Sequence, residues 1–154
     1  FKSYKQEYDL DYTIFRFFYT YGPLQSKDFV VSKFISAALK DEDITIYGDG
    51  SQTRTFCFVD DNIQACVNAF TEDQVLNDVV NIGSDKVYTV LELAQEIIKI
   101  SDTKSKIIHL PPLEEGDMSR RQPDTGKMLE LLGKEPQSLS QGLKKVIENP
   151  SFFL

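Results

Sequence analysis

Hydrophobic and polar positions along the chain follow two different periods, which predict strands alternating with helices. β-Branched and aromatic residues fill positions 12–21 and stop at Gly22-Pro23, as expected for a buried strand that ends in a turn. Short apolar runs at 44–47, in "VVNIG" and in "KIIHLPP" predict further strands. An alternation of this kind is typical of the α/β class.

Helices are predicted where apolar residues recur three and four positions apart. Residues 29–39 show this spacing and form one face of a helix. A second helix is expected after Asp60 or Asp61, since either carboxylate can cap it. Its apolar positions are Ile63, Cys66, Val67 and Phe70.

Capping signals mark the ends of three later helices. In Thr89–Glu92 and in Ser138–Gln141, the first hydroxyl and the last side chain can each bond a free backbone N–H, which is a capping box. Asp124 precedes a short helix that is expected to end at Gly133, because glycine readily adopts the left-handed conformation that follows many helices.

The segment "IYGDGSQTRTF", residues 46–56, places a single arginine after a tight turn. Asp49-Gly50 predicts a type I′ turn between two extended segments, because both central residues of that turn need positive φ. The second segment, roughly 53–59, carries Arg54. From the residues alone, an ion pair with Asp60 or Asp61 explains this arginine.

Composition narrows the possible partners. The 154 residues include 17 Lys and Arg against 24 Asp and Glu, giving a formal net charge of −7, and 41% are hydrophobic. The chain can bury a core as one globular unit, although two small lobes also suit its length. The sequence has no cluster of basic residues that would bind nucleic acid or an anionic membrane surface. It also has no apolar run long enough to span a membrane. We therefore expect a cytoplasmic protein that binds neither nucleic acid nor membrane.

Metal and thiol chemistry are not indicated. Cys57 and Cys66 lie in apolar surroundings without CxxC spacing, so we expect reduced core residues. His109 is the only histidine and lies in a predicted strand. A single histidine without a Cys/His cluster makes a poor metal site, so we expect a strand residue with a satisfied ring.

Six motifs occur in an order and at spacings that resemble one enzyme family. They are "RFFYTYGP", "FVVSKFISAALKDEDITIYGDGSQTRTFCFVDD", "VVNIGSD", "YTVLELAQEI", "DMSRRQPD" and "LLGKEPQSLSQGLKKVI". Together they resemble the C-terminal half of the extended short-chain dehydrogenase/reductases that act on nucleotide sugars, from about residue 10 to residue 147. This family includes UDP-glucuronate decarboxylases, dTDP-glucose 4,6-dehydratases and UDP-sugar 4-epimerases. The resemblance implies the last strands of a Rossmann-type sheet plus the small substrate-binding domain.

The family's N-terminal half carries two features that this sequence lacks. One is a glycine-rich dinucleotide-binding loop, and the other is a Tyr-x-x-x-Lys catalytic pair. By the resemblance, residues 1–154 form one fragment, in which elements completing the NAD-binding sheet are interleaved with the substrate-binding domain. We expect no catalytic residue in this fragment and no hydride transfer by it alone.

The resemblance also implies binding roles for particular side chains. Arg54 and Arg121 would hold the diphosphate of the nucleotide sugar, with Arg120 as the alternative to Arg121, because the arginine fork can donate two parallel hydrogen bonds to it. Tyr47 would pack against the base, although a core aromatic is the competing interpretation. The substrate-binding residues implied are Tyr19, Phe29, Val30, Val31, Tyr47, Arg54 and Arg121, and the cofactor-binding residues are Arg16 and Phe18.

Two positions depart from the family pattern. The family usually has Asn where this chain has Tyr19, and a phenol is larger and has a single O–H donor. Thr55 stands where dehydratases commonly have Asp, which leaves decarboxylase-like or unassigned members of the family as candidates. The exact binding position of the substrate and its identity are therefore left open.

These residues predict the nucleotide-sugar-binding portion of an NAD-dependent epimerase, dehydratase or decarboxylase. The missing half would hold most of the cofactor, so the choice between NAD and NADP stays open, as does the choice between a UDP-sugar and a dTDP-sugar. A homodimer is expected for the full-length enzyme. The alternative interpretation is a non-catalytic nucleotide-sugar-binding module or scaffold.

Overall fold

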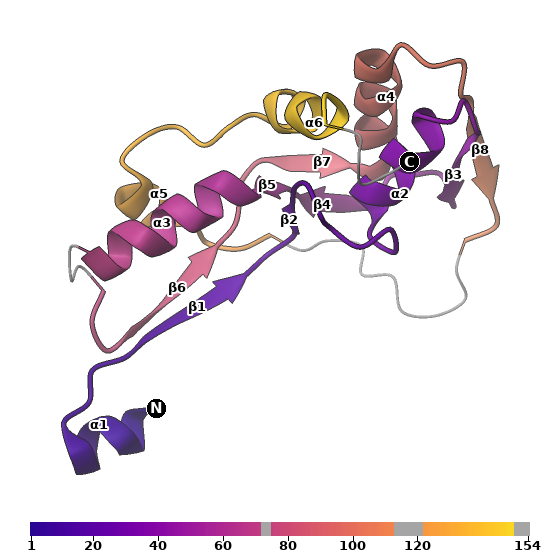
Figure 1. Cartoon of the computed structure of the whole chain (residues 1–154). Helices are drawn as coiled ribbons and strands as arrows, with labels where there is room; N and C mark the ends of the chain where they lie inside the picture. Colours follow the sequence, from indigo (N-terminus) through magenta and orange to yellow (C-terminus); the bar gives the residue numbers. More distant parts are fainter. Residues whose placement is uncertain (72–74, 113–121, 150–154) are drawn as a thin grey trace.

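The computed structural model describes residues 1–71, 75–112 and 122–149. The described helices are α1 Lys2–Tyr8, α2 Val30–Ala38, α3 Val59–Thr71, α4 Val90–Ser101, α5 Gly126–Leu132 and α6 Leu139–Ile147. The described strands are β1 Thr13–Phe17, β2 Thr20–Tyr21, β3 Ile44–Tyr47, β4 Thr53–Thr55, β5 Cys57–Phe58, β6 Asp78–Ile82, β7 Val87–Thr89 and β8 Ile107–Leu110. The chain is thus a mixed α/β structure. It is elongated, with α1 at one end and the β3/β8 pair at the other (Figure 1).

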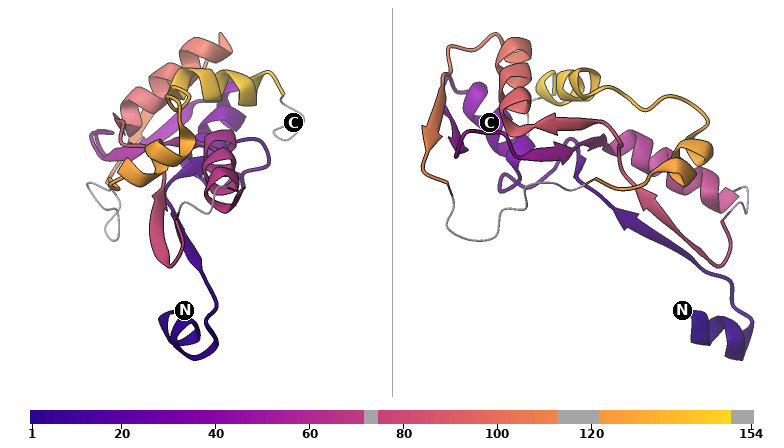
Figure 2. Two further views of the ribbon diagram at one scale, coloured as in Figure 1. Left: turned by 90° about the vertical axis from the view of Figure 1, so that its left-hand side faces the viewer. Right: turned by 180° about the vertical axis from the view of Figure 1, so that it is seen from behind.

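The strands join segments that lie far apart in the sequence. β1 pairs in parallel with β6, β2 with β5, and β3 with β8, whereas β4 and β7 are antiparallel. Parallel pairing requires crossover connections, which the helices provide. Helices α4 and α6 lie on the same side of the β4/β7 pair, as Figures 1 and 2 both show.

Two hydrophobic cores divide the molecule, and β5 connects them. The larger core gathers α2, α4 and α6 around β3, while the smaller one lies between α3, α5 and β6. Phe56 and Phe58 belong to the larger core, and Cys57 between them belongs to the smaller. Successive residues of an extended segment face opposite sides, so one short strand can serve both cores. The interleaving of two domains itself stays a prediction.

The predicted capping boxes and the predicted glycine at a helix end are confirmed. Thr89 and Ser138 both form complete capping boxes, with Glu92 and Gln141 respectively. Gly133 ends α5 with φ 63°, and its N–H bonds the Leu129 carbonyl. The strand predicted over 44–47 is β3, and the helix predicted over 29–39 is α2.

The single buried strand predicted over 12–21 is wrong in two respects. It is two strands, β1 and β2, separated at Phe18 and Tyr19, and Tyr19 has φ 39°. Arg16 and Phe17 at the end of β1 are exposed. Among the described residues, β1 pairs only with β6, so its other edge is open.

The predicted turn at Asp49-Gly50 does lie between two strands, β3 and β4, but its predicted type I′ geometry is wrong. Positive φ occurs at Gly48 and Gly50 but not at Asp49. The flanking strands do not pair with each other, because β3 pairs with β8 and β4 pairs with β7. The Asp49 carboxylate instead accepts a hydrogen bond from the Ser51 N–H, at 2.9 Å. The turn therefore sends the chain from one strand pair to another.

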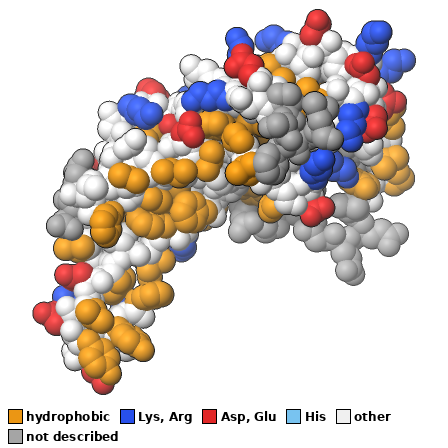
Figure 3. All heavy atoms as spheres, in the orientation of Figure 1, with side chains coloured by type: hydrophobic (Ala, Val, Ile, Leu, Met, Phe, Trp, Pro, Cys, Tyr) orange, Lys and Arg blue, Asp and Glu red, His pale blue; other side chains and the backbone are white. Residues whose placement is uncertain are grey.

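Helix α3 buries small and polar residues and exposes large apolar ones. Ala65 and Ala69 are buried against the smaller core, whereas Phe70 is 84% exposed and Ile63 and Val67 are exposed as well. Figure 3 shows hydrophobic side chains gathered over the part of the surface formed by α3, β1 and α1. Neither Asp60 nor Asp61 precedes the helix, because α3 already begins at Val59.

The remaining sequence expectations concern membrane spans, thiols and the histidine. In residues 1–71, 75–112 and 122–149, no helix has the length and apolar character needed to cross a membrane. Cys57 is a buried free thiol and Cys66 a half-buried one. The His109 ring is satisfied as predicted, since its Nδ1 lies 2.8 Å from the Gly48 carbonyl oxygen.

Candidate functional site

A pocket of about 820 Å³ lies between the β1–β2 segment, the first turns of α2, and the β3–β4 connection. It is lined mainly by aromatic and aliphatic side chains. The expected binding residues that line it are Phe18, Tyr19, Phe29, Val30, Val31, Tyr47 and Arg54. Among these expected residues alone, side chains up to 36 positions apart in the sequence, Phe18 and Arg54, thus meet at one site.

Arg54 enters the pocket from β4, where it contacts Thr53 and Tyr19. It is only 7% exposed, and its Nη1 donates a hydrogen bond of 2.7 Å to the Thr53 carbonyl. Its guanidinium carbon lies 5.7 Å from the centroid of the Tyr19 ring. The ion pair considered from sequence does not form, because Asp60 pairs with Lys145 and Asp61 with Lys134.

Tyr19 lies at the break between β1 and β2. Its ring contacts the Phe56 ring edge to face, with the centroids 6.2 Å apart. The backbone on both sides is anchored, since the Phe18 N–H bonds the Ile82 carbonyl and the Cys57 N–H bonds the Tyr19 carbonyl. The ring therefore contacts both Arg54 and a residue of the larger core.

Tyr47 is 37% exposed, so its ring is partly available at the pocket wall. The Lys33 ammonium lies 5.9 Å from the centroid of this ring, and Gln52 donates a hydrogen bond of 3.2 Å to the Tyr47 carbonyl. Lys33 and Gln52 line the pocket but were not predicted from the sequence. Spacing from the predicted site residues could have indicated them. Lys33 follows Phe29 by one helical turn and Gln52 precedes Arg54 by two positions in an extended segment, and residues at these spacings share a face.

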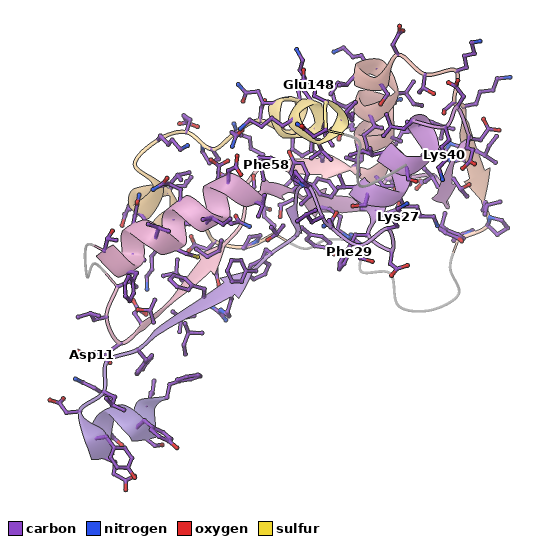
Figure 4. The ribbon with its side chains drawn as sticks, viewed as in Figure 1. Asp11, Lys27, Phe29, Lys40, Phe58 and Glu148 are labelled. Atoms are coloured by element: carbon purple, nitrogen blue, oxygen red, sulfur yellow. The ribbon has the colours of Figure 1, made fainter. Side chains whose placement is uncertain are left out.

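The N-terminus of α2 forms another wall. Phe29 is the N-cap residue in an extended conformation, and no side chain caps the helix. Backbone N–H groups in a first helical turn lack intrahelical partners and can donate to a ligand. The loop that leads into α2 is braced by Gln25, which bonds the Thr20 carbonyl and accepts from Ser32. Figure 4 shows Phe29 and Lys27 on this loop, beneath α2.

The charge of the lining differs from that of the chain. Among the described lining residues, Arg54 and Lys33 are cationic and Asp28 alone is anionic, whereas the whole chain has a formal net charge of −7. Buried neighbours stay neutral, because burial raises the pKa of Tyr21 well above its ordinary range and that of Cys57 to about 12. A mainly apolar pocket with concentrated positive charge suits a ligand that joins a flat ring to an anionic group.

Two of the expected residues are not brought into this pocket by the described structure. Arg16 is exposed on β1 and is absent from the lining. Arg121, with its alternative Arg120, lies outside the described residues. No group of three or more His, Cys, Asp or Glu side chains in the described part of the chain is placed to hold a metal ion.

An NAD cofactor would meet only a small part of this chain. Phe18 lines the pocket at the end of β1, where the resemblance expects the nicotinamide. The sequence contains no glycine-rich loop of the kind that cradles a dinucleotide diphosphate. The residues present therefore fit contact with one end of the cofactor and not with its phosphates.

Comparison with known proteins agrees with these observations. The profile of the NAD dependent epimerase/dehydratase family matches residues 1–83. The chain is 38% identical over 149 residues to a UDP-N-acetyl-alpha-D-glucosaminuronate decarboxylase of Bacillus cytotoxicus, covering 90% of this chain and 46% of the relative. It is 38% identical over 150 residues to UDP-glucuronic acid decarboxylase 4 of Arabidopsis thaliana, covering 96% of this chain and 33% of that protein.

Solved structures show the same relationship. A UDP-glucose 4-epimerase from Thermotoga maritima, solved with UDP-glucose, superposes with a TM-score of 0.85 at 34% identity, covering 96% of this chain and 48% of that one. A UDP-glucuronic acid 4-epimerase from Bacillus cereus, in complex with UDP-glucuronic acid and NAD, gives a TM-score of 0.81 at 32% identity, covering 96% and 47%. The chain spans less than half the length of these relatives, so its fold corresponds to part of a Rossmann-type enzyme. It belongs to the NAD dependent epimerase/dehydratase family.

Proposed function

We propose that this chain is the nucleotide-sugar-binding portion of an NAD-dependent epimerase or decarboxylase. The observation that carries the proposal is the position of Arg54, a cation 7% exposed in a pocket that also presents Tyr47 and the N-terminus of α2. A nucleoside diphosphate has a flat base and a strongly anionic group. This pocket offers a matching aromatic ring and guanidinium.

Each wall has a proposed role. Tyr47 stacks on the base, and the backbone of Phe29, Val30 and Val31 contacts the edge of the base. Arg54 donates to the diphosphate, and Arg121 approaches the same group from its own loop. These contacts act far from the reacting sugar carbon. They contribute to turnover by positioning the sugar against the cofactor.

The relatives support one substrate class. The two solved relatives above hold UDP-sugars in their structures, and the two sequence relatives above are decarboxylases of UDP-linked uronic acids. We infer a UDP-sugar as the substrate of the full-length protein, with a dTDP-sugar as the alternative. Thr55 supports a decarboxylase or epimerase over a dehydratase. The cofactor is NAD or NADP, held mainly by residues outside this chain, and the full-length enzyme is a cytoplasmic homodimer.

Titration calorimetry on the full-length protein tests the proposal. UDP, dTDP and uridine are titrated separately, and UDP-glucuronate is incubated with the protein and NAD while products are followed by chromatography. The proposal expects UDP to bind at least tenfold more tightly than uridine, with a UDP-sugar product formed. Equal affinities for UDP and uridine would contradict it. Tight UDP binding without any product would favour a non-catalytic nucleotide-sugar-binding module.

A further inference from the structure

The backbone of Tyr19 adopts a conformation that a tyrosine rarely takes. Its φ of 39° lies in the left-handed region, where a Cβ crowds the backbone. The conformation is imposed by two strand pairs, because Phe18 is bonded to Ile82 and Tyr19 is bonded to Cys57. Backbone strain of this kind persists only where the surrounding structure determines it, and it occurs often at ligand sites.

This backbone conformation places the aromatic ring beneath a cation. The Arg54 guanidinium carbon lies 5.7 Å from the Tyr19 centroid, within the distance at which a cation is attracted to an aromatic face. The Tyr19 ring also contacts Phe56, which is a buried member of the larger core. The ring is therefore a rigid platform connected to the core.

The contacts of Arg54 limit the freedom of its side chain. An arginine side chain has several rotatable bonds, and immobilising it has an entropic cost that a ligand must overcome. Within the described part of the chain, the contacts that reduce that freedom before any ligand binds include the hydrogen bond from Nη1 to the Thr53 carbonyl and the contact with the Tyr19 ring. Thr53 is part of β4, and the Tyr19 carbonyl is hydrogen-bonded to β5. The guanidinium is therefore pre-organised at the pocket wall.

We propose that Tyr19 is a positioning residue for Arg54, acting through the face of its ring and not through a hydroxyl contact to the ligand. This inference rests on the proposed function, since it takes Arg54 to bind the diphosphate. An asparagine at this position could contact an anion directly but has no aromatic face. The chain would thus have replaced a direct polar contact by an indirect one that orients an arginine.

The test compares UDP with uridine on the full-length protein, because only UDP carries the diphosphate. Tyr19→Phe keeps the ring and removes the hydroxyl, whereas Tyr19→Leu and Tyr19→Met remove the ring and keep apolar volume. We expect Tyr19→Phe to retain most of the advantage of UDP over uridine. The other two should lower that advantage by roughly 2- to 30-fold, the range expected for losing a cation–π contact. Uridine affinity reports whether each variant is folded at the base-binding wall.

A double-mutant cycle separates this inference from the proposed function. In an Arg54→Ala background, Tyr19→Leu should cause no further loss of the UDP advantage. If Tyr19→Phe lowers the advantage of UDP over uridine as much as Tyr19→Leu does, the hydroxyl contacts the ligand. The proposed role of the ring face is then refuted. An unchanged UDP advantage in Tyr19→Leu, with a reduced one in Arg54→Ala, overturns only the present inference. An unchanged advantage in Arg54→Ala overturns both.

Discussion

The Tyr21 hydroxyl donates a hydrogen bond of 3.2 Å to the Leu139 carbonyl and so joins β2 to the first residue of α6. The two residues are 118 positions apart, and both are buried in the larger core. Burial keeps this phenol protonated, since it raises the pKa of Tyr21 far above its ordinary value. The contact requires a close approach of α6, which Gly142 permits.

Gly142→Ala should therefore destabilise the protein. A Cβ at this position would lie 2.0 Å from the Tyr21 hydroxyl oxygen and 2.9 Å from Phe58 Cδ2, so the helix or both rings must move. Overpacking of this kind costs about 1–3 kcal/mol of unfolding free energy, measured by urea denaturation. Gly126→Ala is the matched control, because its Cβ would meet only Asp124 Oδ1 at 3.5 Å. Equal stabilities of the two variants would contradict the packing described for α6.

Stability should fall in acid, partly through Asp41. The Lys104 backbone N–H, followed by the Thr103 hydroxyl, lowers the pKa of Asp41 below its ordinary value of 3.8. A carboxyl whose pKa is lower in the folded state stabilises that state above its unfolded pKa, and this contribution is lost as the pH falls through the folded pKa. Between about pH 5 and pH 2.5, Asp41→Asn should therefore lose less unfolding free energy than the wild type. If the unfolding free energy of the two proteins fell identically over this pH range, Asp41 would not contribute.

The exposed face of α3 should make the isolated 154-residue chain self-associate. Ile63, Val67 and Phe70 are all exposed, and β1, which has only β6 as a partner among the described strands, lies in the same part of the molecule (Figure 1). Exposed apolar surface and unpaired strand edges both promote association. Size-exclusion chromatography with light scattering should show mixed species, and Val67→Asp with Phe70→Ser should shift them toward the monomer. A monodisperse wild-type monomer would contradict the expectation.

Much of the fold could be predicted because its signals are local. The capping boxes at Thr89 and Ser138 and the left-handed Gly133 depend on residues three or four positions apart, so the sequence contains all that they need. The failures concern longer distances. Asp49-Gly50 has the composition of a hairpin turn, but β3 finds its partner in β8, about 60 residues away, and the turn adopts another conformation.

The site was predictable to a different degree. Spacing within the chain does not bring Tyr19, Phe29, Tyr47 and Arg54 together, and only the resemblance to a family suggested one pocket for them. The structure does place them around that pocket, while leaving Arg16 outside it. The contact between Arg54 and Tyr19 could not be foreseen, because it depends on the left-handed backbone at Tyr19.

Tyr47 should govern the affinity for the base alone. Base–aromatic stacking contributes about 1–3 kcal/mol per base, so Tyr47→Ala should weaken uridine and UDP by a similar factor of roughly 5- to 150-fold. Tyr47→Phe retains the ring face and should bind both nearly as well as the wild type. Titration calorimetry on full-length protein measures this. A loss confined to UDP would place the diphosphate, and not the base, beside Tyr47.

The central claim is that Arg54 binds the diphosphate, and the most direct test is the ratio of UDP affinity to uridine affinity in full-length Arg54→Ala, Arg54→Lys and wild type. Losing a hydrogen-bonded charged contact of about 1.5–3 kcal/mol should lower the ratio roughly 10- to 150-fold in Arg54→Ala. Arg54→Lys should fall between the two, because an ammonium cannot reproduce the planar fork. Lys40→Ala, which removes an exposed cation outside the pocket, controls for net charge and should leave the ratio unchanged (Figure 4). A wild-type ratio in Arg54→Ala, accompanied only by a lower melting temperature, would show that Arg54 is structural and would contradict the account.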